Sequence, residues 1–484
     1  MRTTIILAGL ALAAVCETAQ AQKTYPYISV DSDPIQARIY TLDNGLTVYL
    51  SNNPDAPRIQ TNIAVRAGSK NDPATATGLA HYLEHMLFKG TSTIASADWE
   101  KEAPLLQRIS DLYELRRATT DEARRDAIYH EIDSVSHLAA TFAVPNEYDK
   151  MVTSIGAKGT NAYTSTERTV YVNDIPSNEM EKWMMLESKR FQECVLRLFH
   201  TELETVFEEF NRGQDNDYRN MAYAMAKAMY KHHPYGTQTT IGTGEHLKNP
   251  SMMKIHEYFD TYYVPNNMAV IMAGDLDYDQ TIAMVDKYFG PWKPKPVPAF
   301  TFTPEEPITA PVSLDVFGPT AEWVGLGWRF NGYASSDPIM LELISGLLSN
   351  GSAGLIDLDL MQQQKVLGAG ASSDDQIDYS EFEMSGEAKE GQKLEEVRDL
   401  LLAELEKVKK GEFDDWLIEA VVNNYKKDQI QFWNDNNGRR AAALTDAFIK
   451  HKDWKDVVDY YDRMGRITKQ EVMDFASKNF GNNY

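Results

Sequence analysis

The sequence is poor in cysteine and in basic residues. Only two cysteines, Cys16 and Cys194, occur among 484 residues. Cys16 falls in a leader segment, so Cys194 is the only cysteine expected in the mature protein, and no internal disulfide can form. Lysine and arginine number 48 against 71 aspartates and glutamates, which gives a net charge of −23. Because nucleic-acid binding depends on basic side chains, this charge argues against a nucleic acid as partner.

Long apolar runs are also scarce. One run, residues 5–15, follows a basic residue and precedes a small-x-small sequence at residues 19–21. These features predict a secretory signal peptide over residues 1–21. The run is too short for a comfortable membrane span, and no later run is apolar enough for one. We therefore expect an exported protein without a transmembrane segment, periplasmic or extracellular in a Gram-negative bacterium. The residues before Cys16 disfavour a lipid on that cysteine.

The most informative stretch is His81-Tyr82-Leu83-Glu84-His85. On a helix, residues four apart lie on one face, so both imidazoles can reach one ion, with Glu84 beside them. Two neutral nitrogens and a carboxylate within proton-transfer reach are what a zinc hydrolase needs to activate water. The order H-x-x-E-H is itself a metallopeptidase signature.

The residues around this motif, 79–87, are expected to form a helix. Their apolar members make one stripe at the helical period, and His81, Glu84 and His85 fall on the opposite face. The alternative is that this opposite face is merely solvated. Such a face usually carries Lys, Glu, Gln or Arg and rarely two histidines one turn apart, so the pattern favours a metal site.

Two histidines leave a tetrahedral zinc short of one protein ligand, with the last position kept for water. Residues 201–210 are expected to form a helix, because their apolar members recur at i, i+3, i+4 and i+7. Glu202 and Glu209 border that apolar stripe, whereas Glu204 and Glu208 point away from it. A carboxylate that binds a buried metal should flank the core. The spacing therefore favours Glu209 as ligand and Glu202 as a group that orients a ligand histidine or the water. The alternative is an ordinary acidic helix.

Elsewhere the hydrophobic pattern predicts further strands and helices. The expected strands are residues 46–50, 60–66, 170–172 and 268–273, and the expected helices include 105–117, 121–142 and 179–193. Prolines crowd between residues 291 and 311, which indicates a domain boundary.

The second part of the chain repeats the first. Residues 251–263 match residues 468–480 at an offset of 217 at both ends (468 − 251 and 480 − 263). A buried strand follows the first copy at once, whereas the second copy reaches Tyr484 where that strand should begin. Either the last strand is dispensable or the chain is part of a longer protein. We favour the second alternative, because an unfinished sheet leaves an unpaired edge.

The two repeats differ in chemistry, since residues 337–350 of the second copy, where a metal helix would fall, contain no histidine. We expect a catalytic zinc-binding repeat at residues 22–297, with a helical insertion near 97–150. A second, metal-free repeat that lacks its last strand is expected at residues 298–484.

Several stretches of the first repeat resemble the pitrilysin or insulinase family of zinc metallopeptidases, which includes the mitochondrial processing peptidases. They occur in family order: residues 78–91 (GLAHYLEHMLFKGT), 161–164 (NAYT), 202–209, 233–236 (HPYG), 263–268 and 273–275.

The resemblance implies an α+β fold of two homologous mixed α/β repeats, each a mostly antiparallel sheet covered by helices, which together form half of a clamshell. It also implies one zinc ion per chain. The site residues that it implies are the zinc ligands His81, His85 and Glu209, the general base Glu84, the supporting acid Glu202, and the substrate-binding residues Asn161, Ala162 and Tyr163.

Two features depart from the family pattern. His85 and Glu209 are 124 residues apart (209 − 85), which is longer than usual, and the charged helices within residues 100–143 account for the excess. Family members also close two similar halves around the substrate, whereas this chain contains only the catalytic half. A second chain or a C-terminal continuation is therefore implied as a partner.

The sequence thus predicts a secreted zinc endopeptidase that hydrolyses peptides or small unfolded polypeptides. The main alternative is a non-catalytic or weakly active subunit that forms one wall of a partner peptidase's chamber. The complete set of ligands together with Glu84 argues against it. A purely structural zinc is disfavoured, because such sites usually fill all four positions with Cys and His.

Overall fold

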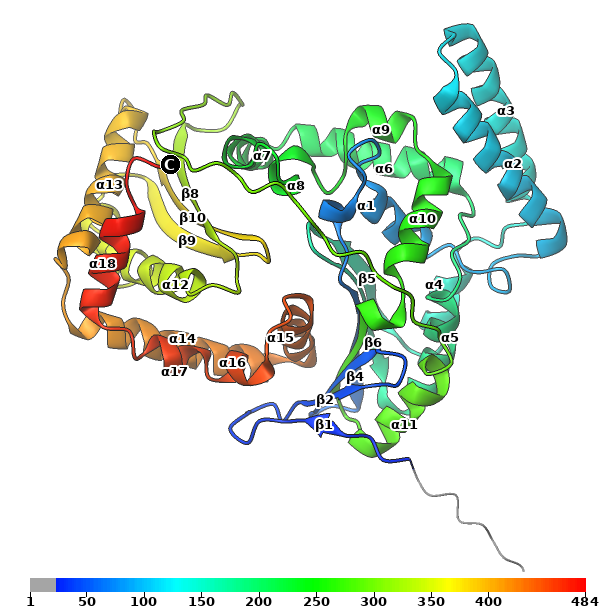
Figure 1. Ribbon diagram of the computed structural model, residues 1–484, viewed down its shortest axis with the longest axis horizontal. Helices are drawn as coiled ribbons and strands as arrows, with labels where there is room; N and C mark the ends of the chain where they lie inside the picture. Colours follow the sequence, from blue (N-terminus) through cyan, green and yellow to red (C-terminus); the bar gives the residue numbers. More distant parts are fainter. Residues whose placement is uncertain (1–22) are drawn as a thin grey trace, which may run out of the picture.

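A computed structural model describes residues 23–484 of the chain. The predicted signal peptide and Cys16 lie outside the described residues. Two units follow one another along the chain, and each is a sheet with helices packed against it (Figure 1). The predicted α+β fold class is confirmed. Cys194 is a free thiol, and no helix within residues 23–484 is long and apolar enough to cross a membrane.

The sheet of the first unit has seven strands in the order β1-β2-β3-β7-β4-β6-β5. β3 and β7 run parallel, and all other neighbours run antiparallel. The strands are β1 (Tyr27–Ile28), β2 (Arg38–Thr41), β3 (Thr47–Asn52), β4 (Arg58–Val65), β5 (Lys158–Thr164), β6 (Thr169–Pro176) and β7 (Met268–Gly274). β7 is buried along its whole length, because it lies inside the sheet with both faces covered. The four strands expected from the sequence are β3, β4, β6 and β7.

Eleven helices belong to the first unit within the described part of the chain. They are α1 (Leu79–Met86), α2 (Trp99–Ala118), α3 (Glu122–Ala140), α4 (Glu147–Ser154), α5 (Met180–Arg190), α6 (Phe199–Gln214), α7 (Asp217–Met229), α8 (Pro234–Thr237), α9 (Gly244–Lys248), α10 (Met252–Tyr262) and α11 (Tyr278–Phe289). α2 and α3 form a long helical hairpin that projects from the unit (Figure 1). The side chains of Asp98 and Asp121 cap their N-termini.

The second unit begins after residues 290–322, which contain no helix or strand and include the proline-rich stretch. Its antiparallel sheet has the order β8-β10-β9. Its strands are β8 (Trp323–Asn331), β9 (Gly368–Asp375) and β10 (Tyr379–Glu387). Its helices are α12 (Asp337–Leu348), α13 (Leu394–Lys410), α14 (Trp416–Asp435), α15 (Asn437–Ile449), α16 (Trp454–Val458), α17 (Tyr460–Met464) and α18 (Lys469–Asn479).

Each unit contributes one helix to the other unit's sheet. α15 packs on β4 and β7 of the first sheet, where Leu444 and Phe448 share a buried core with Ala269 and Ile271. α7 of the first unit packs on β8 of the second (Figure 1). Because both exchanges bury apolar side chains, they hold the two units together.

Candidate metal centre

The start of helix α1, which carries the H-x-x-E-H sequence, is fixed by two residues. The Asp72 carboxylate accepts hydrogen bonds from the backbone N–H groups of Gly78 and Ala80 at 2.7 and 3.0 Å. These are donors that a helix N-terminus leaves without partners. Burial raises the pKa of Asp72 to about 7. Gly78 has a φ of +86°, and a Cβ there would lie 2.6 Å from the carbonyl oxygen of Ile241, so glycine is required.

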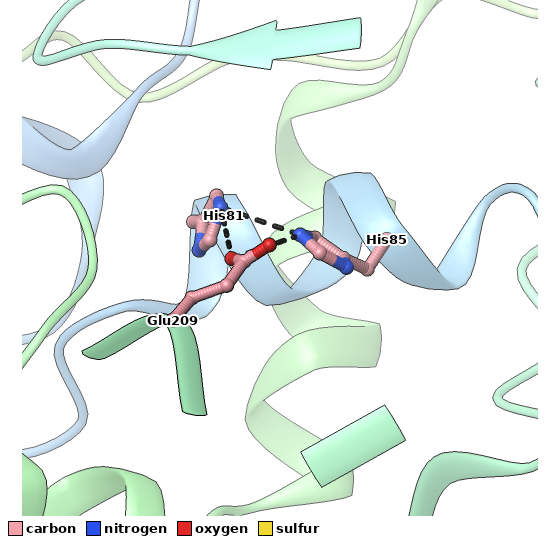
Figure 2. A group of neighbouring side chains, drawn as sticks. All are labelled: His81, His85 and Glu209. Carbon is pink, nitrogen blue, oxygen red and sulfur yellow. Dashed lines mark hydrogen bonds and ion pairs between the residues drawn. The ribbon is translucent and has the colours of Figure 1, made fainter. Parts of the chain in front are cut away.

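Helix α6 brings Glu209 to the two histidines of α1 (Figure 2). The Nε2 atoms of His81 and His85 lie 3.3 Å apart. Oε2 of Glu209 lies 3.6 Å from Nε2 of His81 and 3.7 Å from Nε2 of His85. In a tetrahedral zinc site with bonds of about 2.0–2.1 Å, ligand atoms lie about 3.3 Å apart. The three donor atoms therefore fit a single zinc ion, and they form the one such cluster found within residues 23–484.

The histidine environment also suits a cation. Burial and the nearby His85 lower the pKa of His81 to about 4, so its imidazole is neutral and offers a lone pair. Burial lowers the pKa of His85 as well. The hydrogen bond with Glu202 and the charge of Glu209 outweigh that effect, and the net shift is upward. A bound cation would displace the proton that these carboxylates favour.

Glu202 holds His85 from the side opposite the cluster. Its Oε1 atom lies 2.8 Å from Nδ1 of His85, and its Oε2 atom lies 2.5 Å from Nζ of Lys89. Burial raises the pKa of Glu202, but its hydrogen bonds with His85 and Lys89 outweigh burial and lower it overall. An ionised Glu202 favours the His85 ring with Nδ1 protonated and Nε2 turned toward Glu209.

The remaining glutamates of α6 lie as the helical pattern predicts, since Glu204 and Glu208 are exposed to solvent. Lys89 is a residue of the site that was not predicted from the sequence. It lies beyond the last residue of α1, so helical spacing could not place it.

Glu84 is buried beside the histidines, with 7% of its surface exposed. The Thr164 hydroxyl, at the end of β5, donates a hydrogen bond of 2.6 Å to Oε2 of Glu84. Burial raises the pKa of Glu84. Thr164 is a second residue of the site that was not predicted from the sequence. Strand alternation could have found it, because it lies two residues after Ala162 and so points to the same side of the strand.

Strand β5 is an edge strand of the first sheet. The adjacent turn shows which residues of β5 form hydrogen bonds with β6 and which face away from it. Ser165 donates its N–H to the carbonyl of Arg168, so Asn161 and Tyr163, at even spacing from Ser165, also pair with β6. The N–H and C=O of Ala162 between them face away from β6. The side chains of Asn161 and Tyr163 are exposed. A cavity of about 890 Å³ connects β5 with the histidines and Glu209.

Two family models match the chain. Residues 47–107 match the family described as Insulinase (Peptidase family M16), and residues 251–425 match the family described as Peptidase M16 inactive domain. The chain belongs to the pitrilysin/insulinase family of peptidases, peptidase family M16. The resemblance inferred from the sequence is therefore confirmed.

One relative is the zinc protease PqqE of Helicobacter pylori, which is 24% identical over 91% of this chain and 89% of its own length. The chain spans only 45% to 50% of the length of the next three curated relatives that it matches. A crystal structure of a protease from H. pylori has the same fold, with a TM-score of 0.74, 22% identity, and coverage of 95% of this chain and 98% of that chain. The periplasmic protease PqqL from Escherichia coli gives a TM-score of 0.70 at 16% identity, with coverage of 94% of this chain and 47% of that chain.

Proposed function

We propose that this protein is a secreted zinc-dependent endopeptidase that hydrolyses peptides or small unfolded polypeptides. The proposal depends chiefly on one observation, the convergence of His81, His85 and Glu209 around a space that fits one zinc ion. The buried Glu84 carboxylate beside them supplies a base, and the adjacent edge of β5 supplies a place for an extended chain. Relatives named zinc proteases support the same assignment.

In this proposal His81, His85 and Glu209 hold one zinc ion per chain. When bound, zinc lowers the pKa of water and polarises the carbonyl of the scissile bond. Glu84 takes the proton from the attacking water and passes it to the departing amine. Glu202 is a positioning residue that holds the His85 ring through Nδ1.

An extended peptide would pair with the outer edge of β5. The outward N–H and C=O of Ala162 would bond to the substrate backbone, while Asn161 and Tyr163 would contact its side chains. Main-chain pairing of this kind gives affinity without strict choice of substrate side chains. It therefore suits an enzyme that acts on unfolded polypeptides.

A second metallopeptidase-like half is proposed to close over this site. The chain corresponds to 47% of PqqL, so that protease is about twice as long as the part that this chain matches. The second half is either another chain or a C-terminal continuation. The signal-peptide pattern and the periplasmic relative PqqL support an exported, periplasmic location.

The test is the Glu84→Gln variant, compared with the wild type and with Glu208→Gln as a matched control on an exposed face. We expect one zinc per chain in all three proteins. Cleavage of an internally quenched peptide should fall by at least about 100-fold only in Glu84→Gln, because the general base is lost while the ligands remain. Chelator-sensitive cleavage by the wild type, alone or with its second half, is also expected.

Cleavage by Glu84→Gln at the wild-type rate would refute the assignment of the base. A wild type that binds zinc but does not cleave peptides, even with the second half present, would instead support the role of a chamber-wall subunit.

A further inference from the structure

The cavity at the metal centre has a basic wall that takes no part in the proposed chemistry. This cavity, of about 890 Å³, is lined by β5 and by α6 and the first turns of α7. The last turn of α6 contributes Arg212, and the first turn of α7 contributes Arg219. Both side chains are exposed to solvent. Neither guanidinium group is a metal ligand or a proton carrier in the proposed reaction.

These two arginines carry the unpaired charge of the cavity. Within residues 23–484, neither guanidinium group forms a salt bridge or a hydrogen bond. The other lysine, aspartate and glutamate side chains that line the cavity all belong to the metal centre or pair with it: Glu84, Lys89, Glu202 and Glu209. A wall with two free cations is unexpected in a chain that has 71 acidic and 48 basic residues.

Two contacts fix the position of Arg219. Its backbone N–H donates a hydrogen bond of 2.9 Å to the side-chain oxygen of Asn216, the residue that caps α7. Its side chain lies across Gly213 of α6, where a Cβ would overlap Nη1 of Arg219. Glycine is less favourable than alanine inside a helix. Here it leaves room for the guanidinium group, which is therefore held against α6.

Tyr223 lies one turn after Arg219 on α7 and lines the same cavity, with 37% of its surface exposed. Burial raises the pKa of Tyr223, and the positive charge of Arg219 opposes that rise. The hydroxyl is neutral near pH 7, so it can donate a hydrogen bond. The wall thus offers two cations and one neutral donor to an anionic group.

The basic wall lies close to the metal ligands. Gly213 follows Glu209 by four residues, so both lie on one face of α6, about 6 Å apart along the helix axis. Figure 2 shows Glu209 reaching from α6 toward the two histidines. Because Nη1 of Arg219 lies against Gly213, the guanidinium group is about one helical turn from the metal ligand along α6. An extended peptide advances about 3.3 Å per residue, so this distance corresponds to about two residues of substrate.

We infer that Arg219 and Arg212 form a subsite for an acidic side chain of the substrate, about two residues from the cleaved bond. The inference rests on the proposed function, since it treats the cavity as the place where an extended peptide pairs with β5. Side chains of an extended peptide point alternately to opposite sides, so one set faces the wall formed by α6 and α7. A guanidinium group binds a carboxylate through two parallel N–H donors. The substrate class is therefore unfolded polypeptides with glutamate or aspartate near the cleaved bond.

The overall charge of the protein acts against this preference. A net charge of −23 repels acidic peptides at long range. Salt at about 0.15 M screens charges that are more than about 8 Å apart, whereas contacts inside the cavity are screened less. A preference for acidic peptides at this salt concentration therefore reports on the local arginines and not on the net charge.

Binding of labelled peptides tests the inference. Three peptides share one sequence, except that two alternate central residues are both Glu, both Gln or both Lys. Fluorescence anisotropy gives their Kd values at about 0.15 M salt, with zinc-loaded protein in the Glu84→Gln background so that no peptide is consumed. We expect the Glu peptide to bind at least about fivefold more tightly than the Gln peptide, because its carboxylate gains charge-assisted hydrogen bonds. The Lys peptide should bind most weakly.

Variants of the wall should change this order. Arg219→Met should reduce the preference for the Glu peptide, and Arg219→Glu should make the Lys peptide the tightest binder. Gly213→Ala keeps every charge and should also reduce the preference, because its Cβ displaces the guanidinium group. Lys478→Met is the control for net charge. It removes an exposed lysine of α18 in the second unit and should leave the preference unchanged.

Equal binding of the Glu and Gln peptides with the wall intact would overturn the inference, and so would an unchanged preference in Arg219→Glu. Cleavage of all three peptides by the wild type with equal kcat/KM would leave the proposed function in place and overturn only the inference. The expected binding preference without cleavage by the wild type, even with the second half present, would contradict the proposed function and support the subsite.

Discussion

The Nδ1 atom of His85 lies 2.8 Å from Oε1 of Glu202, across 117 residues of sequence. Seven residues further along the same helix, Glu209 reaches the Nε2 atoms of both histidines. One face of α6 therefore presents both a carboxylate for the ion and a carboxylate that orients a ligand for it. Two helices in fixed contact are enough to assemble the centre.

Glu202→Gln should weaken zinc binding by about 10- to 100-fold, because the neutral amide no longer fixes the tautomer and direction of the His85 ring. Competition with a chelator of known affinity measures this loss. Glu204→Gln, which removes an exposed carboxylate from the same helix, should leave zinc affinity unchanged. Equal affinities for the two variants would show that Glu202 does not act on His85.

Lys89→Met should weaken zinc binding by less than Glu202→Gln, because Lys89 acts through the Oε2 atom of Glu202, 2.5 Å away. The double variant Lys89→Met/Glu202→Gln should then lose little more zinc affinity than Glu202→Gln alone. The effects of two residues that act through the same contact are not additive. The same chelator competition on both single variants and the double variant measures this. Fully additive losses would argue for a separate role of Lys89.

Ala162→Pro should lower kcat/KM for peptide cleavage about 3- to 10-fold, because it removes one outward N–H that we propose bonds to the substrate. Proline is tolerated in an edge strand where the N–H faces outward, so zinc content and the melting temperature should change little. Ala162→Ser, which keeps the N–H, is the matched control. If both variants cleave peptides equally well, the substrate does not use this edge.

Asp446→Asn should destabilise the fold by about 1 to 2 kcal/mol near pH 7, since the partly exposed carboxylate joins α15 to Arg168 of the first unit. Burial raises the pKa of Asp446, but Lys450, Lys452 and Arg168 outweigh it and hold that pKa well below its usual range.

An aspartate with a lowered pKa stabilises the folded state above its unfolded pKa of about 3.9 and loses that effect as the pH falls toward its folded pKa. The stability difference between wild type and Asp446→Asn, measured by urea unfolding, should therefore be constant from pH 7 to about pH 5 and shrink below about pH 4. A stability difference that grows as the pH falls would show that the lowered pKa of Asp446 does not cause it.

The spacing of apolar residues was sufficient to predict several helices and strands, and to predict which face of each site helix carries the site residues. The helical period of residues 79–87 and of 201–210 predicted α1 and α6, because a helix that buries one face has its apolar residues at that spacing. The same spacing separated Glu209 and Glu202 from Glu204 and Glu208. The parallel pairing of β3 with β7 could not be predicted, because strand pairing joins residues that are far apart in the chain.

The sequence by itself determined that two histidines and a glutamate share one short helix, that a second helix turns two of its four carboxylates toward the core, and that the chain repeats at an offset of 217. Only the tertiary structure decided that Glu209 meets both histidines, that Lys89 and Thr164 hold the two other carboxylates, and that α7 and α15 each cover the other unit's sheet. The physical reason is the distance along the chain over which each kind of interaction acts. Periodicity reports which side of an element is buried, whereas the partner on that side is chosen by packing between segments that are 80 or more residues apart in these contacts.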